Sequence, residues 1–297
     1  MTEFAAAVTS RVPSVGRLGD LAALGKPRLS VLVIFTAAIG VFLAPEPPGP
    51  WTTAGFLLAT AALVAAANTL NCWLERDIDG LMARTHRRPL PAGRLEPRTA
   101  LGFGIALAIA ALCGVAASSN ARTALLGAAA LLIYVLVYTP LKRLSPWALL
   151  VGAVPGALPP LMGWTAATDR LDVPGWFLFG VLFLWQLPHF IAISLYLEAD
   201  FRRAGIRALP ITHGRRAARA LLFAFVAALC GFSLLAFPLG LAGPAYAAIA
   251  LSIGLAWLVL AAGGLRRTAS EDWARRLFAA SLLYLPILIT AIVLDAV

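Results

Sequence analysis

The chain has 297 residues, of which 61% are hydrophobic and only 13% are charged, and its mean hydropathy is +0.86. Soluble domains carry roughly twice this charged fraction, so the composition excludes a water-soluble protein and indicates a surface that faces lipid. The formal net charge of +10 is weak evidence for nucleic-acid binding, because the sequence contains no soluble basic domain. We therefore expect no nucleic-acid partner.

A helix crosses a bilayer with about 20 predominantly apolar residues. On this criterion the sequence predicts an all-α, polytopic protein with one membrane domain over residues 1–297, of which 1–27 form a short cytoplasmic tail. This tail has no apolar core and is not expected to be a cleaved signal peptide. The nine predicted transmembrane helices are 28–46, 52–72, 98–117, 122–139, 146–165, 174–195, 217–238, 243–263 and 277–296.

The basic residues predict the orientation of these helices. With the N-terminus in the cytoplasm, all but two of the 24 lysines and arginines fall on the cytoplasmic side, and the exceptions are Arg122 and Arg170. Loops rich in lysine and arginine stay in the cytoplasm. The sequence therefore predicts a cytoplasmic N-terminus, a periplasmic C-terminus and two long cytoplasmic loops, about 72–97 and 197–217.

Both long loops begin with a cluster of acidic residues, although the whole chain has only 14. In the first cluster Asn71, Glu75 and Asp79 are four residues apart. In a continuing helix they lie on one face, about 6 Å apart along the axis. Amide and carboxylate oxygens are the ligands that Mg²⁺ prefers, usually while it bridges to a substrate phosphate. Further candidate metal ligands are Asp77 in the first cluster and Glu198 and Asp200 in the second.

Basic side chains follow the acidic clusters on the same side of the membrane. Carboxylates that hold a metal, together with arginines and lysines that bind phosphate oxygens, suit a metal-bound diphosphate. An alternative is that the acids only neutralise arginines on wet loops. Asn71 argues against it, because it lies in an apolar segment where an amide needs a partner. The candidate diphosphate ligands are Arg84, Arg88, Arg94, Tyr138, Lys142 and Arg143.

The predicted sixth helix carries a glutamine and a histidine, Gln186 and His189, nearly one turn apart. A single histidine in an apolar helix is most often a hydrogen-bonded structural residue. Its neutral ring can also contact a metal-containing ligand. From the residues alone both interpretations stay open.

The first cluster resembles the N-D-x-x-D-x-x-x-D signature of UbiA-type intramembrane prenyltransferases, with Cys72 where many members have Asp and with Glu75 in the middle position. The similarity extends from about residue 25 to 297. Within this superfamily the sequence most resembles the heme branch, the protoheme IX farnesyltransferases. Two blocks carry that closer resemblance, P-P-L-M-G-W at 159–164 and W-Q-L-P-H-F at 185–190.

The resemblance implies a nine-helix bundle whose central cavity opens to the cytoplasmic face, in the cell inner membrane. It implies transfer of the farnesyl group of farnesyl diphosphate to the 2-vinyl group of heme B, with addition of water, giving heme O and diphosphate. Mg²⁺ is then the cofactor, heme B is a substrate, and heme A synthase is a candidate downstream partner. The catalytic residues would be Asn71, Glu75, Asp79 and Asp200, and Gln186 and His189 would bind heme.

The second cluster departs from the superfamily pattern, because Ala204 stands where a second acid is usual, which makes Glu198 a candidate substitute ligand. Other functions also remain open. A prenyltransferase for a quinone or chlorophyll precursor would share the acidic row. A transporter would place ionisable groups near mid-membrane, whereas here they gather at one edge. A purely structural subunit would leave the row from Asn71 to Asp79 unexplained.

Overall fold

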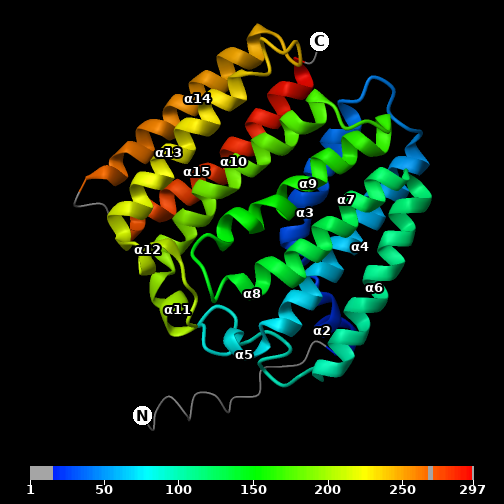
Figure 1. Cartoon of the computed structure of the whole chain (residues 1–297), viewed down its shortest axis with the longest axis vertical. Helices are drawn as coiled ribbons and strands as arrows, with labels where there is room; N and C mark the ends of the chain where they lie inside the picture. The colour runs from blue at the N-terminus through cyan, green and yellow to red at the C-terminus, as the bar shows by residue number, and fades with distance from the viewer. Residues whose placement is uncertain (1–15, 267–269, 296–297) are drawn as a thin grey trace.

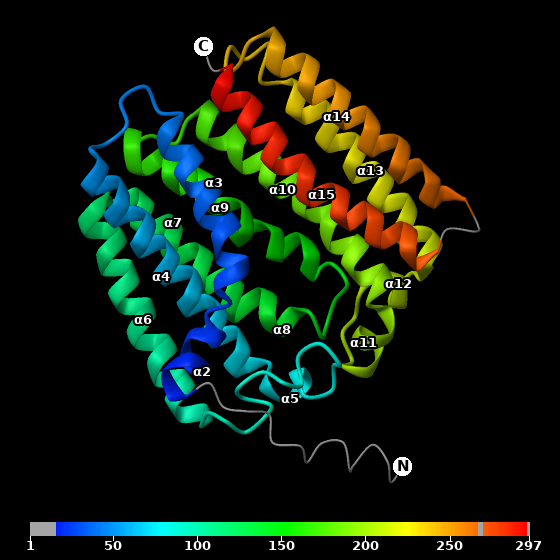
Figure 2. The same cartoon turned by 180° about the vertical axis from the view of Figure 1, so that it is seen from behind.

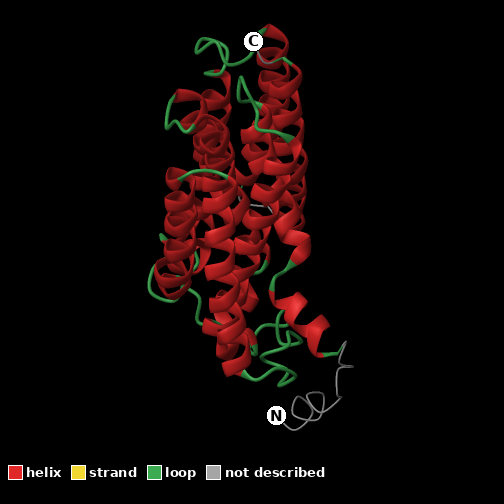
Figure 3. Cartoon of the chain, turned by 90° about the vertical axis from the view of Figure 1, so that its right-hand side faces the viewer, coloured by secondary structure: helices red, strands yellow, loops and turns green. Residues whose placement is uncertain are grey.

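The computed structural model of the chain describes residues 16–266 and 270–295, and these residues form helices and loops without any strand (Figures 1 and 3). Eight helices are long and apolar enough to cross a membrane. They are α4 (Pro50–Leu74), α6 (Pro97–Ser118), the continuous helix α7–η2–α8 (Ala121–Leu141), α9 (Ala148–Thr168), α10 (Val173–Tyr196), α13 (Gly214–Leu234), α14 with η3 (Pro244–Leu265) and α15 (Glu271–Leu294).

A ninth apolar helix, α3 (Pro27–Phe42), has only 16 residues and corresponds to the first predicted segment, 28–46. Each of the other eight predicted segments lies on one of the eight long helices. The all-helical prediction is confirmed, and the chain is a multi-pass membrane protein. The count of nine spanning helices holds if the short α3 is included.

Four short helices lie together at one end of the bundle (Figures 1 and 2). They are α2 (Arg17–Leu24), α5 (Arg76–Asp79), α11 (Glu198–Arg203) and α12 (Leu209–Thr212). The last three belong to the two long loops that the sequence predicts on the cytoplasmic side. The two loops that carry the acidic clusters therefore meet at the same end of the molecule.

The long helices differ in how much of their surface they bury. In α9 and α10, 72% and 61% of the apolar stretch lies inside the protein, against 22–28% in α6, α7–α8, α13 and α14. Figure 1 shows α7 beside α9, and α13 and α15 beside α10, with α6 and α14 at the outer edges. Helices α9 and α10 therefore form the centre of the bundle, and the outer helices present apolar side chains to lipid.

Helices α3 and α9 cross with their backbones in contact. A Cβ atom at Gly40 would collide with the carbonyl oxygen of Pro160, and one at Gly163 with the carbonyl oxygen of Ala37. Small residues allow this close approach, which replaces the hydrophobic driving force that is missing between helices in lipid. The contact holds the C-terminal half of α3 against the central helix α9.

We expect Gly163→Ala to lower the melting temperature of the purified protein, because the obstructing atom is backbone and cannot rotate away. Overpacking of this kind costs about 1–3 kcal/mol. Gly102→Ala in α6 is the matched control, since a Cβ there meets no atom within 4 Å. That variant should be neutral or slightly stabilising, and equal melting shifts in both variants would contradict the packing argument.

Candidate functional site

A cavity of about 300 Å³ lies where the two long loops meet the ends of α4, α8 and α10. Its polar part contains two acids, Glu75 and Asp79, and five basic side chains, Lys26, Arg84, Arg88, Lys142 and Arg207. Its apolar part contains Leu149 and, on α10, side chains that include Phe190 and Ile193. The cavity thus joins a strongly cationic end to an apolar end.

The acidic row keeps its helical spacing although α4 ends at Leu74. The Glu75 N–H donates to the carbonyl oxygen of Asn71 at 2.9 Å, and the Asp79 N–H donates to that of Glu75 at 2.8 Å. These bonds continue the helix from α4 into α5, so all three side chains stay on one face. They are 1%, 7% and 1% exposed, respectively, which requires partners for their polar atoms.

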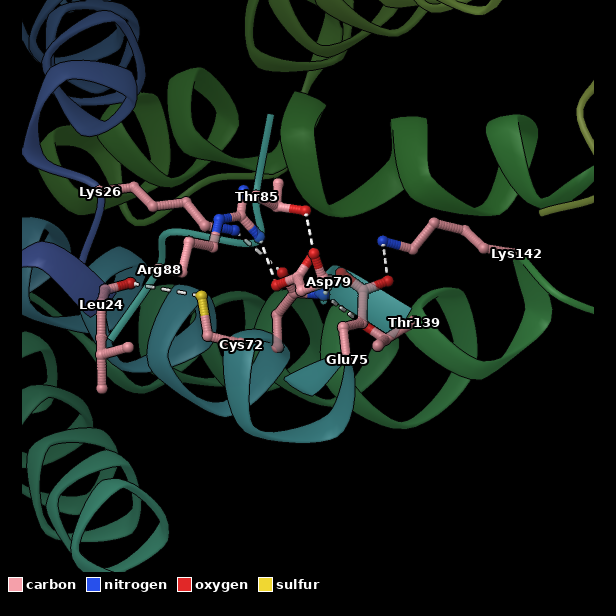
Figure 4. A network of polar contacts seen from close by, with 10 residues as sticks. Leu24, Lys26, Cys72, Glu75, Asp79, Thr85, Arg88, Thr139 and Lys142 are labelled. Carbon is pink, nitrogen blue, oxygen red and sulfur yellow. Dashed lines mark hydrogen bonds and ion pairs between the residues drawn. The ribbon is translucent and has the colours of Figure 1, made fainter. Parts of the chain in front are cut away.

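The side chains of Asn71 and Glu75, the first two residues of the row, contact Lys26, Thr139 and Lys142 (Figure 4). Lys26 Nζ donates to Asn71 Oδ1 at 3.0 Å, and Asn71 Nδ2 donates to Glu75 Oε2 at 2.9 Å and to Thr139 Oγ1 at 3.1 Å. Lys142 Nζ forms an ion pair with Glu75 Oε1, although that oxygen has no hydrogen bond of regular geometry. The row is therefore tied to α3 and to α8.

Asp79 is held differently. Arg88 Nη1 donates to its Oδ2 at 2.6 Å, and Thr85 Oγ1 donates to its backbone carbonyl oxygen at 2.7 Å. Its other carboxylate oxygen, Oδ1, is buried and has no hydrogen-bond partner among the described residues. A buried carboxylate oxygen without a partner is costly, so this atom is available to a cation.

Burial and neighbouring charges act on the two lysines in opposite directions. Burial lowers the pKa of Lys26 below its usual value. Burial also opposes the charged form of Lys142, but Tyr138 and the Glu75 carboxylate raise the pKa of Lys142 above its usual value. Lys142 therefore carries its proton at neutral pH and can balance an anion.

Tyr134 and Tyr138 form an aromatic wall of the cavity next to Lys142. The segment Ile133–Tyr138 is a π-helix, and it precedes Pro140, which has no N–H and whose ring crowds the preceding turn. The two rings lie 5.4 Å apart, and Lys142 Nζ lies 4.7 Å from the centre of the Tyr138 ring. The Tyr138 ring thus presents its face to the positive charge of Lys142.

The model of the UbiA prenyltransferase family matches residues 33–283 of the chain. This chain belongs to the UbiA prenyltransferase family. It is 52% identical over 296 residues to a protein of Anaeromyxobacter sp. (strain Fw109-5) named protoheme IX farnesyltransferase, with 100% of both chains covered. A protein of Myxococcus xanthus (strain DK1622) with the same name is 51% identical over 278 residues, covering 94% of this chain and 95% of the relative.

Solved structures of other UbiA prenyltransferases and homologues have the same fold. The structure described for digeranylgeranylglyceryl phosphate synthase has a TM-score of 0.79 at 18% identity and covers 94% of this chain and 98% of its own. A UbiA homolog from Archaeoglobus fulgidus bound to DMAPP and Mg²⁺ has a TM-score of 0.69 at 18% identity, covering 91% and 99%. The chain is a membrane-embedded prenyltransferase of this family.

The residues of the acidic row fit a divalent cation. Their donors are hard oxygens, one of which, Asp79 Oδ1, has no partner. Among the described residues no three His, Cys, Asp or Glu side chains come close enough together to enclose a metal. Two carboxylates and an amide suit Mg²⁺, which keeps several waters and shares its shell with substrate phosphates.

Several predicted site residues of this UbiA prenyltransferase lie outside the cavity. Arg94 donates from Nε to Oδ1 of the buried Asp20 at 2.9 Å and thereby ties α2 to the first loop. Arg143 is exposed, and the Asp77 side chain is 83% exposed with Arg76 at 3.8 Å. None of these three side chains lines the cavity.

The second acidic cluster also lies outside the cavity, and its acids pair with arginines of their own loop. Glu198 accepts from Arg202 at 2.8 Å and from Arg215 at 2.6 Å, and Asp200 pairs with Arg203. Partial burial opposes ionisation of Glu198, but the guanidinium groups of Arg215 and Arg202 outweigh it and lower the pKa of Glu198 below its usual value. Only Phe201 of the cluster lines the cavity.

Gln186 and His189 of α10 lie deeper than the cationic end. The His189 ring stacks on Trp185 and meets Phe278 at a tilt, with both ring centres 4.8 Å away, and its Nδ1 is 2.7 Å from Ser281 Oγ. The amide nitrogen of Gln186 donates to two backbone carbonyls at 3.0 and 3.2 Å. Neither residue lines the cavity, although Phe190, next to His189, does.

The predicted site residues did not include two basic side chains and one tyrosine of the cavity, which are Lys26, Arg207 and Tyr134. Tyr134 lies four residues before Tyr138, so helical spacing gives a signal for it. Lys26 and Arg207 come from a helix start and a loop, where spacing carries no such signal. Their place depends on how α3 and the second loop pack.

Proposed function

We propose that this UbiA prenyltransferase transfers the farnesyl group of farnesyl diphosphate to the 2-vinyl group of heme B, with addition of water, giving heme O and diphosphate. The proposal is supported by the relatives named protoheme IX farnesyltransferase, one of them 52% identical over the full length of both chains. The observation that carries the chemistry is the cavity that joins cationic side chains and an unpartnered carboxylate oxygen to an apolar end.

The chain's own residues bind the diphosphate. Lys142 and Arg88 are paired with Glu75 and Asp79 in the structure and can turn to phosphate oxygens when these carboxylates hold a cation. Mg²⁺ bound to Asn71, Glu75 and Asp79 would neutralise charge on the leaving diphosphate. The basic side chains stabilise the same charge as the C1–O bond of the allylic donor breaks.

The apolar end keeps water from the farnesyl cation until the acceptor has reacted. The terminal carbon of the vinyl group bonds to C1 of the farnesyl group, which moves the positive charge to the carbon next to the porphyrin ring. Water adds there and releases a proton, leaving a hydroxyethylfarnesyl side chain. We propose that His189 contacts the heme from α10, below the diphosphate.

The decisive experiment incubates the purified protein in lipid nanodiscs with heme B, farnesyl diphosphate and Mg²⁺. Chromatography with mass spectrometry should detect a more hydrophobic heme, heavier by one farnesyl and one hydroxyl group. If heme B were recovered unchanged and 4-hydroxybenzoate were prenylated when offered as the acceptor, the result would instead support the quinone-precursor activity.

We also propose that the cavity opens to the cytoplasm and that the C-terminus is periplasmic, as the distribution of basic residues indicates. In a bacterial cell, a reporter fused after Val297 should be active only if it folds in the periplasm. A reporter inserted in the loop at 202–213 should behave as cytoplasmic. A cytoplasmic C-terminus would mean that the short α3 does not cross the membrane.

A further inference from the structure

We infer that the cavity binds a prenyl diphosphate with one divalent cation and that the guanidinium group of Arg207 occupies the place of a second. This inference rests on the proposed use of a prenyl diphosphate. It concerns how many cations the site needs and which side chain of the second loop reaches the diphosphate.

The acids of the second loop are already engaged elsewhere. Glu198 is held by two arginines, and one of these, Arg215, also reaches Glu271 of α15 at 3.3 Å. Asp200 is paired with Arg203. Glu75 and Asp79 are also paired with basic side chains, but they line the cavity, whereas neither acid of the second loop does. To ligate a metal there, Glu198 or Asp200 would have to leave its arginines and move, and breaking those ion pairs is a cost.

Arg207 is the residue of this loop that brings charge to the cavity. Gly205 turns the chain with φ +68°, a conformation that side chains disfavour. Two residues later the Arg207 N–H donates to the Lys142 carbonyl oxygen at 3.0 Å, which fixes this backbone beside the cationic end. Its guanidinium group has no hydrogen bond or ion pair among the described residues and is therefore free to bind an anion.

The charges of the cavity leave little need for a second metal. Five basic side chains face two carboxylates, an excess of three positive charges. A prenyl diphosphate carries about three negative charges at neutral pH. The side chains alone balance it, and a single divalent cation on the acidic row adds two further charges where the leaving oxygen develops charge. A second cation would find no free carboxylate, because both acids of the row serve the first.

A guanidinium group suits this position, because it can bind two phosphate oxygens at once and cannot lose its proton in the working pH range. The test titrates Mn²⁺ against the full-length protein by electron paramagnetic resonance, with the thiolo analogue of farnesyl diphosphate present. We expect one bound Mn²⁺ per chain. Arg207→Gln should weaken binding of the analogue about tenfold, which corresponds to about 1.4 kcal/mol, and leave the number of bound Mn²⁺ unchanged.

Two variants make the test specific. Arg216→Gln removes an exposed arginine of the next helix that does not line the cavity and should leave analogue affinity unchanged. Asp200→Asn should leave one bound Mn²⁺. Two Mn²⁺ per chain, loss of one in Asp200→Asn, or normal affinity in Arg207→Gln would each overturn the inference. If the wild-type protein bound no analogue at all, the proposed function would fail instead.

Discussion

Asp79→Asn should lower the rate of prenyl transfer by about 10²–10³-fold, the range found when one group that stabilises transition-state charge is removed. Asn keeps the size of Asp but lacks the negative charge that attracts a divalent cation. The change also leaves Arg88 without its carboxylate, so the protein becomes more cationic at this point. We therefore expect the thiolo analogue to bind well without Mg²⁺ and to lose its Mg²⁺-dependent gain in affinity, as measured by calorimetry.

Glu75→Gln should have a comparable effect, because it removes the other carboxylate of the row. Asp77→Asn is the control, since the Asp77 side chain is 83% exposed and lies in the same short helix. It should keep nearly full activity. If Asp79→Asn and Glu75→Gln were as active as this control, the row would be a charge-neutralising feature of the loop and no part of a metal site.

The membrane helices could be predicted from the sequence because hydropathy and length decide them almost alone. All nine predicted segments coincide with helices, with ends that differ by a few residues. The exception in length is α3, which is 16 residues long where 28–46 was predicted. The apolar residues Leu43 and Ala44 follow Phe42, but the helix ends at Phe42 and the chain turns before Pro50, so hydropathy overstates the length of the helix.

The acidic row could be predicted because residues four apart stay on one face as long as the chain remains helical. The backbone hydrogen bonds continue across the junction at Glu75, so the chain does remain helical there. Arg94 shows the limit of such reasoning. The position of the Arg94 side chain is set by Asp20, 74 residues earlier in the chain. No local sequence pattern predicts that ion pair. The second acidic cluster is similar, because arginines in its own loop and at the start of α13 compete for its carboxylates.

His189 should prove more important for heme than for the diphosphate, and its hydrogen bonds give the reason. Ser281 Oγ donates its single hydrogen to the Phe278 carbonyl oxygen at 2.6 Å, so it accepts from His189 Nδ1. The neutral ring then carries its lone pair on Nε2, because only one ring nitrogen holds a hydrogen. Stacking on Trp185 and the tilted contact with Phe278 hold the ring in place.

A fixed lone pair in an apolar setting is suited to an iron ion or to a hydrogen-bond donor of the acceptor substrate. The neighbouring Phe190 and, one turn later, Ile193 line the cavity, which places His189 beside its apolar end. The cationic end, by contrast, is formed by residues of other elements. A change at His189 should therefore affect the acceptor and spare the donor.

We expect His189→Ala to weaken heme binding, followed by absorbance, at least tenfold while the affinity for the farnesyl diphosphate analogue stays within twofold. With Mg²⁺ present, Asp79→Asn should show the opposite pattern, because it loses the Mg²⁺-dependent part of the analogue affinity and keeps heme binding. Ser281→Ala is the control for orientation, because it keeps the imidazole but removes the acceptor that fixes its hydrogen on Nδ1, so heme should bind with an altered spectrum and intermediate affinity. If His189→Ala kept normal heme binding and turnover, its hydrogen bond to Ser281 would serve only to join α10 to α15.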